Sequence, residues 1–339
     1  MRNRPVALVL IAFIALFCVC LLISCKNVSL SSDIKCGQSC SSYQQSDSLP
    51  DQPSRGLIRL AIGGDSRNDK SHVVPWAFKE AKRRGAKAFF FLGDLELTEA
   101  IDRRFVPQFA ELGDIPFYPV MGNHEVETLG LIRGRNSQSL QKVKKFKEEF
   151  LTVPGIHLAP FPDAVVYSVD LDGGIHFIAL DNVSRKGEGF GPGQLVWLAE
   201  DLSAANADKK IILVGMHKGL ANNLVTKHAM DEDGPRAVED SNAALELLKH
   251  YKAAVVLVSH SHMYAAYPQD GLQVRLTGGM GAPLVRGLSE ADGGFHHFLL
   301  VDVTPGDSHT PLHVQVVKFP CVPPCTPTKS ETDESEEID

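Results

Sequence analysis

The chain has 339 residues, 44% of them hydrophobic and 22% charged, and a formal net charge of −7. A chain of this length and apolar content can fill a large core, which excludes disorder for most of it. The negative charge excludes an extended nucleic-acid surface, although a small phosphorylated ligand can still bind locally.

The N-terminal segment has the layout of an export signal. Arg2 and Arg4 precede an apolar run over residues 6–23, which ends in Leu22-Ile23-Ser24-Cys25. This ending resembles the lipobox of bacterial lipoproteins, in which the cysteine is acylated and becomes the first mature residue. The resemblance implies a signal peptide over residues 1–24 and an exported protein, lipid-anchored to a bacterial membrane and facing the periplasm or the cell surface. The alternative is an uncleaved anchor, because the apolar run is marginally long enough to span a bilayer.

Two tails flank the expected domain. Residues 25–55 are rich in Ser, Gln and Asp and predict a flexible tether. Residues 321–339 include six acidic residues against one Lys after Cys325 and predict a disordered tail. The tails hold two C-x-x-x-C pairs, namely Cys36, Cys40, Cys321 and Cys325. Outside the cytoplasm these four predict disulfides of open pairing, with a four-cysteine zinc site as the alternative.

Between residues 56 and 320, short apolar runs alternate with amphipathic stretches. The first elements are a strand at 57–62, a helix at 74–84, a strand at 88–92, a helix at 99–112 and a strand at 117–121. A helix at 139–150, strands at 165–169 and 176–180, a helix at 193–205 and strands at 211–214 and 255–258 follow. Beyond Ser261 only strands are expected, at 273–276, 297–303 and 312–318. This order, without internal repeats, predicts a single α/β domain over residues 56–320.

Polar motifs stand where five of these apolar runs stop. They are Gly64-Asp65-Ser66-Arg67, Gly93-Asp94-Leu95, Gly122-Asn123-His124-Glu125, Met216-His217-Lys218 and Ser259-His260-Ser261-His262. Residues just past the carboxyl ends of strands converge on one crevice in α/β sheets. Carboxylate, amide and imidazole groups together suit ions such as Mn, Fe or Zn. Each motif alone is an ordinary turn, but the ordered set predicts a metal centre.

The series resembles the calcineurin-like metallophosphoesterase family, whose motifs run Asp-x-His, Gly-Asp-x-x, Gly-Asn-His-Asp/Glu, a later His and Gly-His-x-His. The resemblance covers about residues 58–303, and Met216-His217-Lys218 with the Gly278-Gly279-Met280-Gly281 turn is similar to the purple-acid-phosphatase-like branch. It implies a four-layer α/β/β/α sandwich that forms one catalytic domain. It also implies hydrolysis of a phosphomonoester or phosphodiester, from a small molecule or a nucleotide, by a metal-bound hydroxide at a dinuclear site of divalent or trivalent ions.

The resemblance also assigns roles to residues. The implied metal ligands are Asp65, Asp94, Asn123, His217, His260 and His262. Asp94 would bridge the two ions, Asp65 and His262 would complete the first site, and the other three would hold the second ion. His124 would lie beside the scissile phosphate and assist the leaving group without binding metal.

Two positions depart from the family pattern. Arg67 stands where most relatives have a first-site His, and a guanidinium is a poor metal ligand. Leu97 stands where purple acid phosphatases have a Tyr ligand and other relatives have an Asp that supports the catalytic His. The first site is therefore one protein ligand short. Either water or Glu96 fills the vacancy, or the first ion binds weakly and arrives with the substrate, or one tightly bound ion suffices.

Several functional alternatives stay open at this point. Arg67 is expected to contact the substrate phosphate, with a structural ion pair as the alternative. Lys218 could also meet phosphate or be an ordinary surface lysine, and residues 228–233 predict a solvated polar loop rather than a substrate-selecting lid. The rival function is a lipoprotein of the same fold that only binds a phosphorylated ligand or an envelope partner. Substrate identity, native metals and oligomeric state are left open.

Overall fold

The computed structural model describes residues 56–96, 101–126, 137–185, 189–306 and 312–320. The expected signal peptide, tether, acidic tail and all cysteines lie outside these residues. Within them, no helix is both long and apolar enough to cross a membrane.

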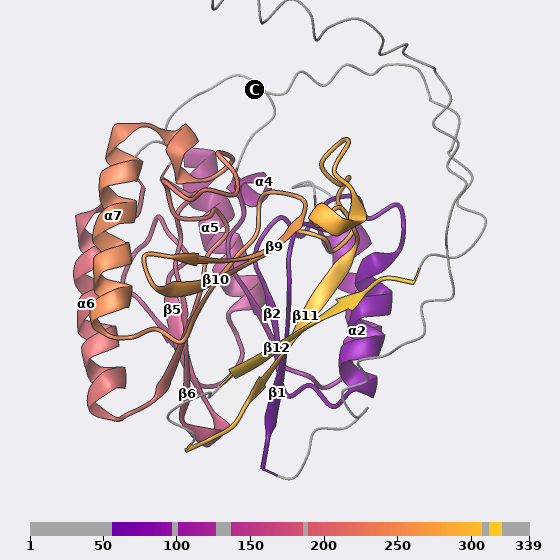
Figure 1. Cartoon of the computed structure of the whole chain (residues 1–339), viewed down its shortest axis with the longest axis horizontal. Helices are drawn as coiled ribbons and strands as arrows, with labels where there is room; N and C mark the ends of the chain where they lie inside the picture. Colours follow the sequence, from indigo (N-terminus) through magenta and orange to yellow (C-terminus); the bar gives the residue numbers. More distant parts are fainter. Residues whose placement is uncertain (1–55, 97–100, 127–136, 186–188, 307–311, 321–339) are drawn as a thin grey trace, which may run out of the picture. The chain divides into compact units, whose positions relative to one another are not determined.

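The described strands form two sheets (Figure 1). The first sheet has the order β12 (Leu312–Lys318), β11 (His297–Val303), β1 (Ile58–Gly63), β2 (Phe89–Phe91) and β3 (Phe117–Pro119). The second has the order β4 (Ile156–Leu158), β5 (Tyr167–Leu171), β6 (Ile175–Ala179), β7 (Ile211–Gly215), β8 (Val255–Val258), β10 (Leu272–Thr277) and β9 (Tyr264–Gln269). Strands β1, β2 and β3 are parallel, as are β6, β7 and β8, so their carboxyl ends point the same way within each sheet.

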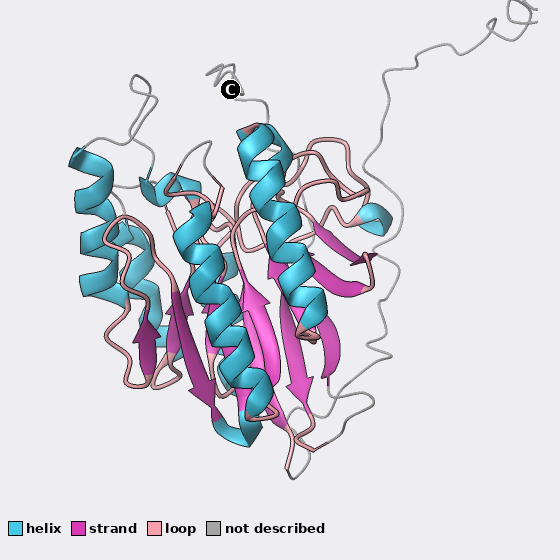
Figure 2. Ribbon diagram, turned by 90° about the vertical axis from the view of Figure 1, so that its left-hand side faces the viewer, coloured by secondary structure: helices cyan, strands magenta, loops and turns pink. Residues whose placement is uncertain are grey.

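Helices cover the outer faces of both sheets. Helices α2 (Val73–Arg83) and α5 (Ser137–Phe150) share a core with the first sheet, and α6 (Gly191–Ala207) and α7 (Pro235–His250) share one with the second. Figure 2 shows the long helices α6 and α7 lying side by side in front of their sheet. The helices bury apolar residues at helical spacing, for example Val74, Ala77, Phe78 and Ala81 in α2.

Aromatic side chains join the two sheets face to face. The rings of Phe90 in β2 and Phe177 in β6 stack with centroids 3.9 Å apart, and both side chains are fully buried. Inward-facing residues of both sheets belong to one continuous core with α2 and α5. The predicted four-layer α/β/β/α sandwich is thereby confirmed.

Some predicted elements were wrong or missing. The expected helix at 99–112 is instead a π-helical turn (Ile101–Phe105), a 3-10 turn (Val106–Gln108) and the short helix α3 (Phe109–Leu112), while residues 99 and 100 lie outside the described ranges. Pro107 explains the break, because it lacks an N–H and its ring clashes with the preceding helical turn. Helix α7, the one-turn helix α4 (Asn123–Val126) and strands β4 and β9 were not predicted.

Candidate metal centre

Five loops at the carboxyl ends of parallel strands meet at one edge of the sandwich, beside α4 in Figure 1. In the first sheet the backbone N–H of Asp65 donates to Gly93 O at 3.0 Å, and in the second the N–H of Ser259 donates to His217 O at 2.8 Å. A third bond, from the N–H of His260 to Asp65 Oδ2 at 2.7 Å, ties the two sheets together. The loops therefore form one connected unit.

Three of the predicted ligands have left-handed backbone conformations. The φ angles of Asp65, Asp94 and His260 are 60°, 57° and 71°. This conformation costs a residue other than glycine about 1–2 kcal/mol, and such strain concentrates at functional sites.

Glycines in the motifs allow the loops to approach closely. A Cβ on Gly122 would collide with the backbone nitrogen and the carboxylate of Asp94. A Cβ on Gly93 would lie 2.7 Å from both Gly122 Cα and His217 Nδ1, and the φ angle of Gly93 is 90°. Both positions require glycine for the site to close.

The predicted ligands of the second site lie together. His217 Nε2 is 3.4 Å from Asp94 Oδ1, 3.0 Å from Asn123 Oδ1 and 3.1 Å from His260 Nδ1. The far nitrogen of each ring faces a group that can only accept: His217 Nδ1 is 2.7 Å from Leu92 O, and His260 Nε2 is 2.8 Å from Glu232 Oε1. Each ring must therefore donate on its far side, and in the neutral tautomer both near nitrogens carry lone pairs. Two lone pairs, an amide oxygen and a carboxylate converging on one point fit a cation.

The predicted ligands of the first site also lie together. Asp65, Asp94 and His262 each offer a ligand atom within 4.8 Å of the others. His262 Nδ1 donates to Pro283 O at 2.8 Å, which leaves Nε2 facing Asp65 Oδ1 at 3.7 Å. That carboxylate oxygen is fully buried and has no hydrogen-bond partner among the described residues. A buried unpaired acceptor beside an imidazole lone pair fits a cation here as well.

The two aspartates differ in electrostatic environment. Burial, opposed by His217 and reinforced by Asp94, raises the pKa of Asp65 to about 7. Burial also acts against ionisation of Asp94, but the surrounding His217, His124 and His260 outweigh it and lower its pKa to about 2. A bound cation would favour the ionised form of both carboxylates.

Arg67 lies at the edge of the first site. Its backbone N–H donates to Asp94 O at 3.1 Å, and after burial its charge is the largest contribution from a charged neighbour that lowers the pKa of His262. Among the described residues, no carboxylate forms an ion pair with its guanidinium. The structure thus provides no support, within those residues, for the ion-pair alternative.

Glu96, the residue expected as one way to fill the missing ligand position, does not join the first site among the described residues. The carboxylate of Glu96 is buried, lies 3.6 Å from Arg104 Nε and is absent from the group formed by Asp65, Asp94 and His262. Leu97 falls outside the described residues.

His124 and Glu125 follow Asn123 in α4 and have different surroundings. The His124 ring is 23% exposed, and its Nε2 is 3.7 Å from Asp94 Oδ2. The buried Glu125 carboxylate accepts the backbone N–H groups of Gly122, Asp94 and Leu95 at 2.7–2.9 Å. Glu125 therefore clamps the two Gly-containing loops against each other.

The loop over residues 228–233 differs from the expected solvated loop. Glu232, in the 3-10 turn η4 (Met230–Asp233), bonds His260, and the His228 ring stacks on His260 with centroids 4.0 Å apart. The Lys218 ammonium contacts both Asp233 Oδ atoms at 2.9 Å. It therefore pairs with this loop rather than lining an open phosphate site. The only sequence feature that could have indicated these contacts is the four-residue spacing between His228 and Glu232.

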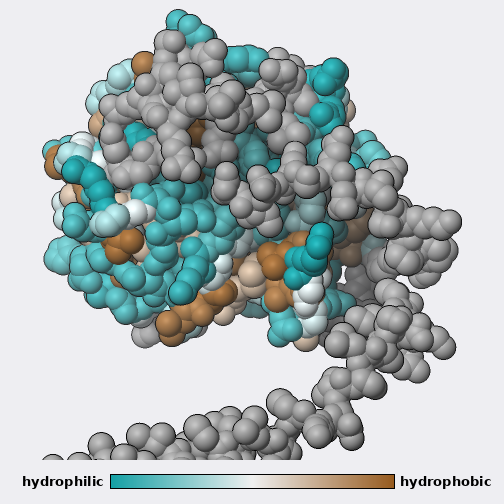
Figure 3. Space-filling model, turned by 90° about the horizontal axis from the view of Figure 1, so that it is seen from above, coloured by the Kyte–Doolittle hydropathy of each residue, from teal (hydrophilic) through white to brown (hydrophobic). Residues whose placement is uncertain are grey.

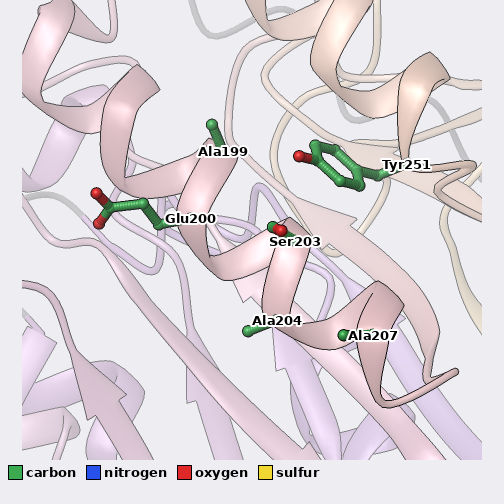
Figure 4. A pocket seen from close by; sticks show the side chains of 6 residues that line it. All are labelled: Ala199, Glu200, Ser203, Ala204, Ala207 and Tyr251. Atoms are coloured by element: carbon green, nitrogen blue, oxygen red, sulfur yellow. The ribbon is translucent and has the colours of Figure 1, made fainter.

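The surface of this edge is mostly hydrophilic where it is visible from above in Figure 3. Away from it, a shallow depression on α6 is lined by Ala199, Glu200, Ser203, Ala204, Ala207 and Tyr251 (Figure 4). This lining contains no cluster of metal ligands, so the chemistry is concentrated at the strand ends.

The family model of calcineurin-like phosphoesterases matches residues 59–264, which is more than half of the chain. The chain belongs to the calcineurin-like phosphoesterase family. No curated protein matches the chain.

Solved structures show the same fold at low sequence identity. Purple acid phosphatase PPD1 from yellow lupin (Lupinus luteus) seeds is 18% identical, with a TM-score of 0.58 over 79% of this chain and 52% of that one. A dimetal phosphatase from Danio rerio is 14% identical, with a TM-score of 0.53 over 76% and 98%. GAP50, the anchor in the inner membrane complex of Plasmodium, is 13% identical, with a TM-score of 0.53 over 78% and 85%. The present chain spans about half the length of the lupin protein.

Proposed function

We propose that this protein hydrolyses phosphate monoesters or diesters at two metal ions. The proposed ligands are Asp65, Asp94, Asn123, His217, His260 and His262, with Asp94 shared between the ions. The observation that carries this proposal is the convergence of His217 Nε2, His260 Nδ1, Asn123 Oδ1 and Asp94 Oδ1 on one point. The buried, unpaired Asp65 Oδ1 supports the first site.

Metal ions bound there would supply a water of lowered pKa and positive charge for the phosphate oxygens. Asp65 and Asp94 offset the charge of the ions, and Glu125 holds the Asp94 loop in place. The His124 ring lies beside Asp94, the proposed shared ligand, and is partly exposed. A phosphate bound at the ions would therefore lie within its reach, and His124 could pass a proton to the leaving oxygen. Arg67 offers a bidentate donor to the phosphate, which compensates for the missing first-site ligand.

The location of the protein is also part of the proposal. Export and lipid anchoring through Cys25 rest on the basic residues, apolar run and Ser24-Cys25 of the N-terminal segment. Expression of Cys25→Ser should abolish incorporation of labelled palmitate and leave a precursor that keeps its signal. Equal labelling of both proteins would contradict lipidation at Cys25.

The test of the activity uses an aryl phosphate and an aryl phosphodiester. The protein loaded with Mn, Fe, Zn, Co or Ni should hydrolyse at least one of them, and Asp94→Asn should remove that turnover. An absence of turnover with every metal over a broad pH range would favour the rival, a lipoprotein that only binds a phosphorylated ligand. Because one fold can host many esters, the substrate itself must be found by screening.

A further inference from the structure

A carboxylate outside the five strand-end motifs contacts one of the proposed ligands of the second site from behind. Glu232 Oε1 lies 2.8 Å from His260 Nε2, and Glu232 Oε2 lies 2.7 Å from His228 Nδ1. One carboxylate therefore accepts from two imidazoles, whose rings stack at an interplanar angle of 20°. Glu232 belongs to the loop between β7 and α7, far along the chain from His260.

His260 differs from the other two proposed histidine ligands in the group behind it. The far nitrogens of His217 and His262 face the backbone carbonyls of Leu92 and Pro283. His260 instead faces an ionisable side chain. A carboxylate behind a metal-binding imidazole fixes its tautomer and raises its basicity more than a neutral carbonyl does.

The turn that carries Glu232 is held at both ends. The backbone N–H of Met230 donates to Gly219 O at 3.0 Å, and the Met230 side chain is fully buried. Lys218 contacts Asp233 at 2.9 Å and Glu232 Oε1 at 3.1 Å, which links the turn to the loop of His217. The position of the Glu232 carboxylate is therefore fixed relative to both histidines of the second site.

We propose that Glu232 is a positioning residue for the second metal site. Its carboxylate accepts a hydrogen bond from the Nε2–H of His260, and this leaves the Nδ1 lone pair directed toward the metal. This inference rests on the proposed function. Its physical content is that metal affinity at one of the two sites depends on a side chain that touches no metal.

A third metal site is the competing interpretation of the same contacts. His228, Glu232 and His260 offer ligand atoms within 4.8 Å of one another. However, the Lys218 ammonium lies 3.1 Å from the same Glu232 oxygen that faces His260, and it would repel a cation placed there. The Nε2 proton of His260 would also have to leave, although Nδ1 already serves the second site. The contacts therefore favour a hydrogen bond over a coordinated ion.

The test compares Glu232→Ala with Asp231→Ala. Asp231 lies in the same turn and carries the same charge, but its carboxylate accepts from the backbone of Asn222 rather than from His260. The detergent-solubilised full chain is stripped with a chelator and titrated with Zn²⁺ against a chromophoric competitor. In Glu232→Ala one of the two binding steps should weaken by about tenfold to a hundredfold. Asp231→Ala should match the wild type, and Glu232→Gln, which keeps an acceptor oxygen, should lose less.

A second measurement uses the metal-free protein. Spectra of ¹⁵N-histidine-labelled protein should show His260 protonated at Nε2 in the wild type and in Asp231→Ala, and a mixture of tautomers in Glu232→Ala. Unchanged zinc affinity and an unchanged tautomer in Glu232→Ala would overturn the proposal, as would equal losses in both alanine variants. Three binding steps in the wild type, one of them lost with Glu232, would establish the third site instead. If the wild type binds none of Zn, Mn, Fe, Co and Ni, the proposed function fails, and the tautomer in metal-free protein still decides the role of Glu232.

Discussion

His217 Nε2 and His260 Nδ1 face each other at 3.1 Å, and each ring is held from behind by a group that only accepts hydrogen bonds. With both rings neutral, two lone pairs face each other at this point, and a cation placed between them would satisfy both. We therefore expect His217→Ala to lower the metal content of the purified protein by about one ion per chain.

Thermal unfolding provides an independent readout of the same change. A ligand present at a hundred times its Kd stabilises a protein by about 2.7 kcal/mol. Chelator should therefore lower the melting temperature of the wild type clearly and that of His217→Ala less. Identical metal contents and identical chelator effects in the two proteins would contradict the assignment.

Arg67 should act on the substrate rather than on the metal. Arg67→Met should raise KM or lower kcat for an aryl phosphate. The lost charged hydrogen bond should cost about 1.5–3 kcal/mol of transition-state stabilisation. That range corresponds to a decrease in kcat/KM of roughly tenfold to a hundredfold. Arg67→Lys retains the charge but not the planar fork, so it should recover only part of the loss. Unchanged turnover and KM in Arg67→Met, at full metal content, would remove Arg67 from the site.

Gly122→Ala should disable the site through the backbone. The added methyl group would collide with the nitrogen and carboxylate of Asp94, so the Asp94 loop must shift. We expect metal content and turnover to fall together. Gly219→Ala is the matched control, because its Cβ would have no neighbour nearer than 3.7 Å and its loop adjoins the same site. An active, fully loaded Gly122→Ala protein would show that the close approach is unnecessary.

Much of the fold was predictable because its strands are buried apolar runs with sharp ends. Phe89–Phe91 is fully buried and stops at Gly93-Asp94, so both the strand and the position of the polar motif follow from the sequence. Helix α7 was missed although its buried residues, including Ala237, Ala244 and Leu248, recur at helical spacing. Strand β9 contains Pro268 and lies at the edge of its sheet, where a strand signal is weak.

The convergence of the candidate residues on one edge was predictable, but their supporting contacts were not. The sequence indicates that Asp65, Asp94 and His260 follow strands, and the parallel topology then brings them to one edge. It does not indicate that the Glu232 turn folds back onto His260, because that contact depends on how the whole segment between β7 and α7 packs. Long-range side-chain pairs of this kind leave no periodic pattern in the sequence.

His176 should make stability depend on pH far from the metal centre. Burial lowers its pKa, but hydrogen bonds to Asp201 and Asp170, at 2.8 and 2.7 Å, outweigh burial and raise it above 6.5. A raised pKa in the folded state stabilises the protein fully below the unfolded pKa, and this contribution is lost as pH rises through the folded pKa. His176→Gln should therefore lose more free energy of unfolding at pH 6 than at pH 9.

Urea unfolding of chelator-treated protein at both pH values checks this prediction, with the exposed His313→Gln as the control. The loss at pH 6 should be on the order of 1 kcal/mol, because two charged hydrogen bonds are lost but the Asp170 side chain is 44% exposed and partly screened by water. An equal loss at pH 6 and pH 9 in His176→Gln would show that the imidazole is not protonated between the two aspartates.

The most direct test of the proposed dinuclear site is anomalous X-ray scattering from crystals of the zinc- or manganese-loaded protein. Two peaks should appear, one among Asp94, Asn123, His217 and His260 and the other among Asp65, Asp94 and His262. A loaded crystal with no peak at the carboxyl ends of β1, β2, β7 and β8, or with these side chains turned away from one another, would contradict the proposed metal centre and the hydrolysis proposed for it.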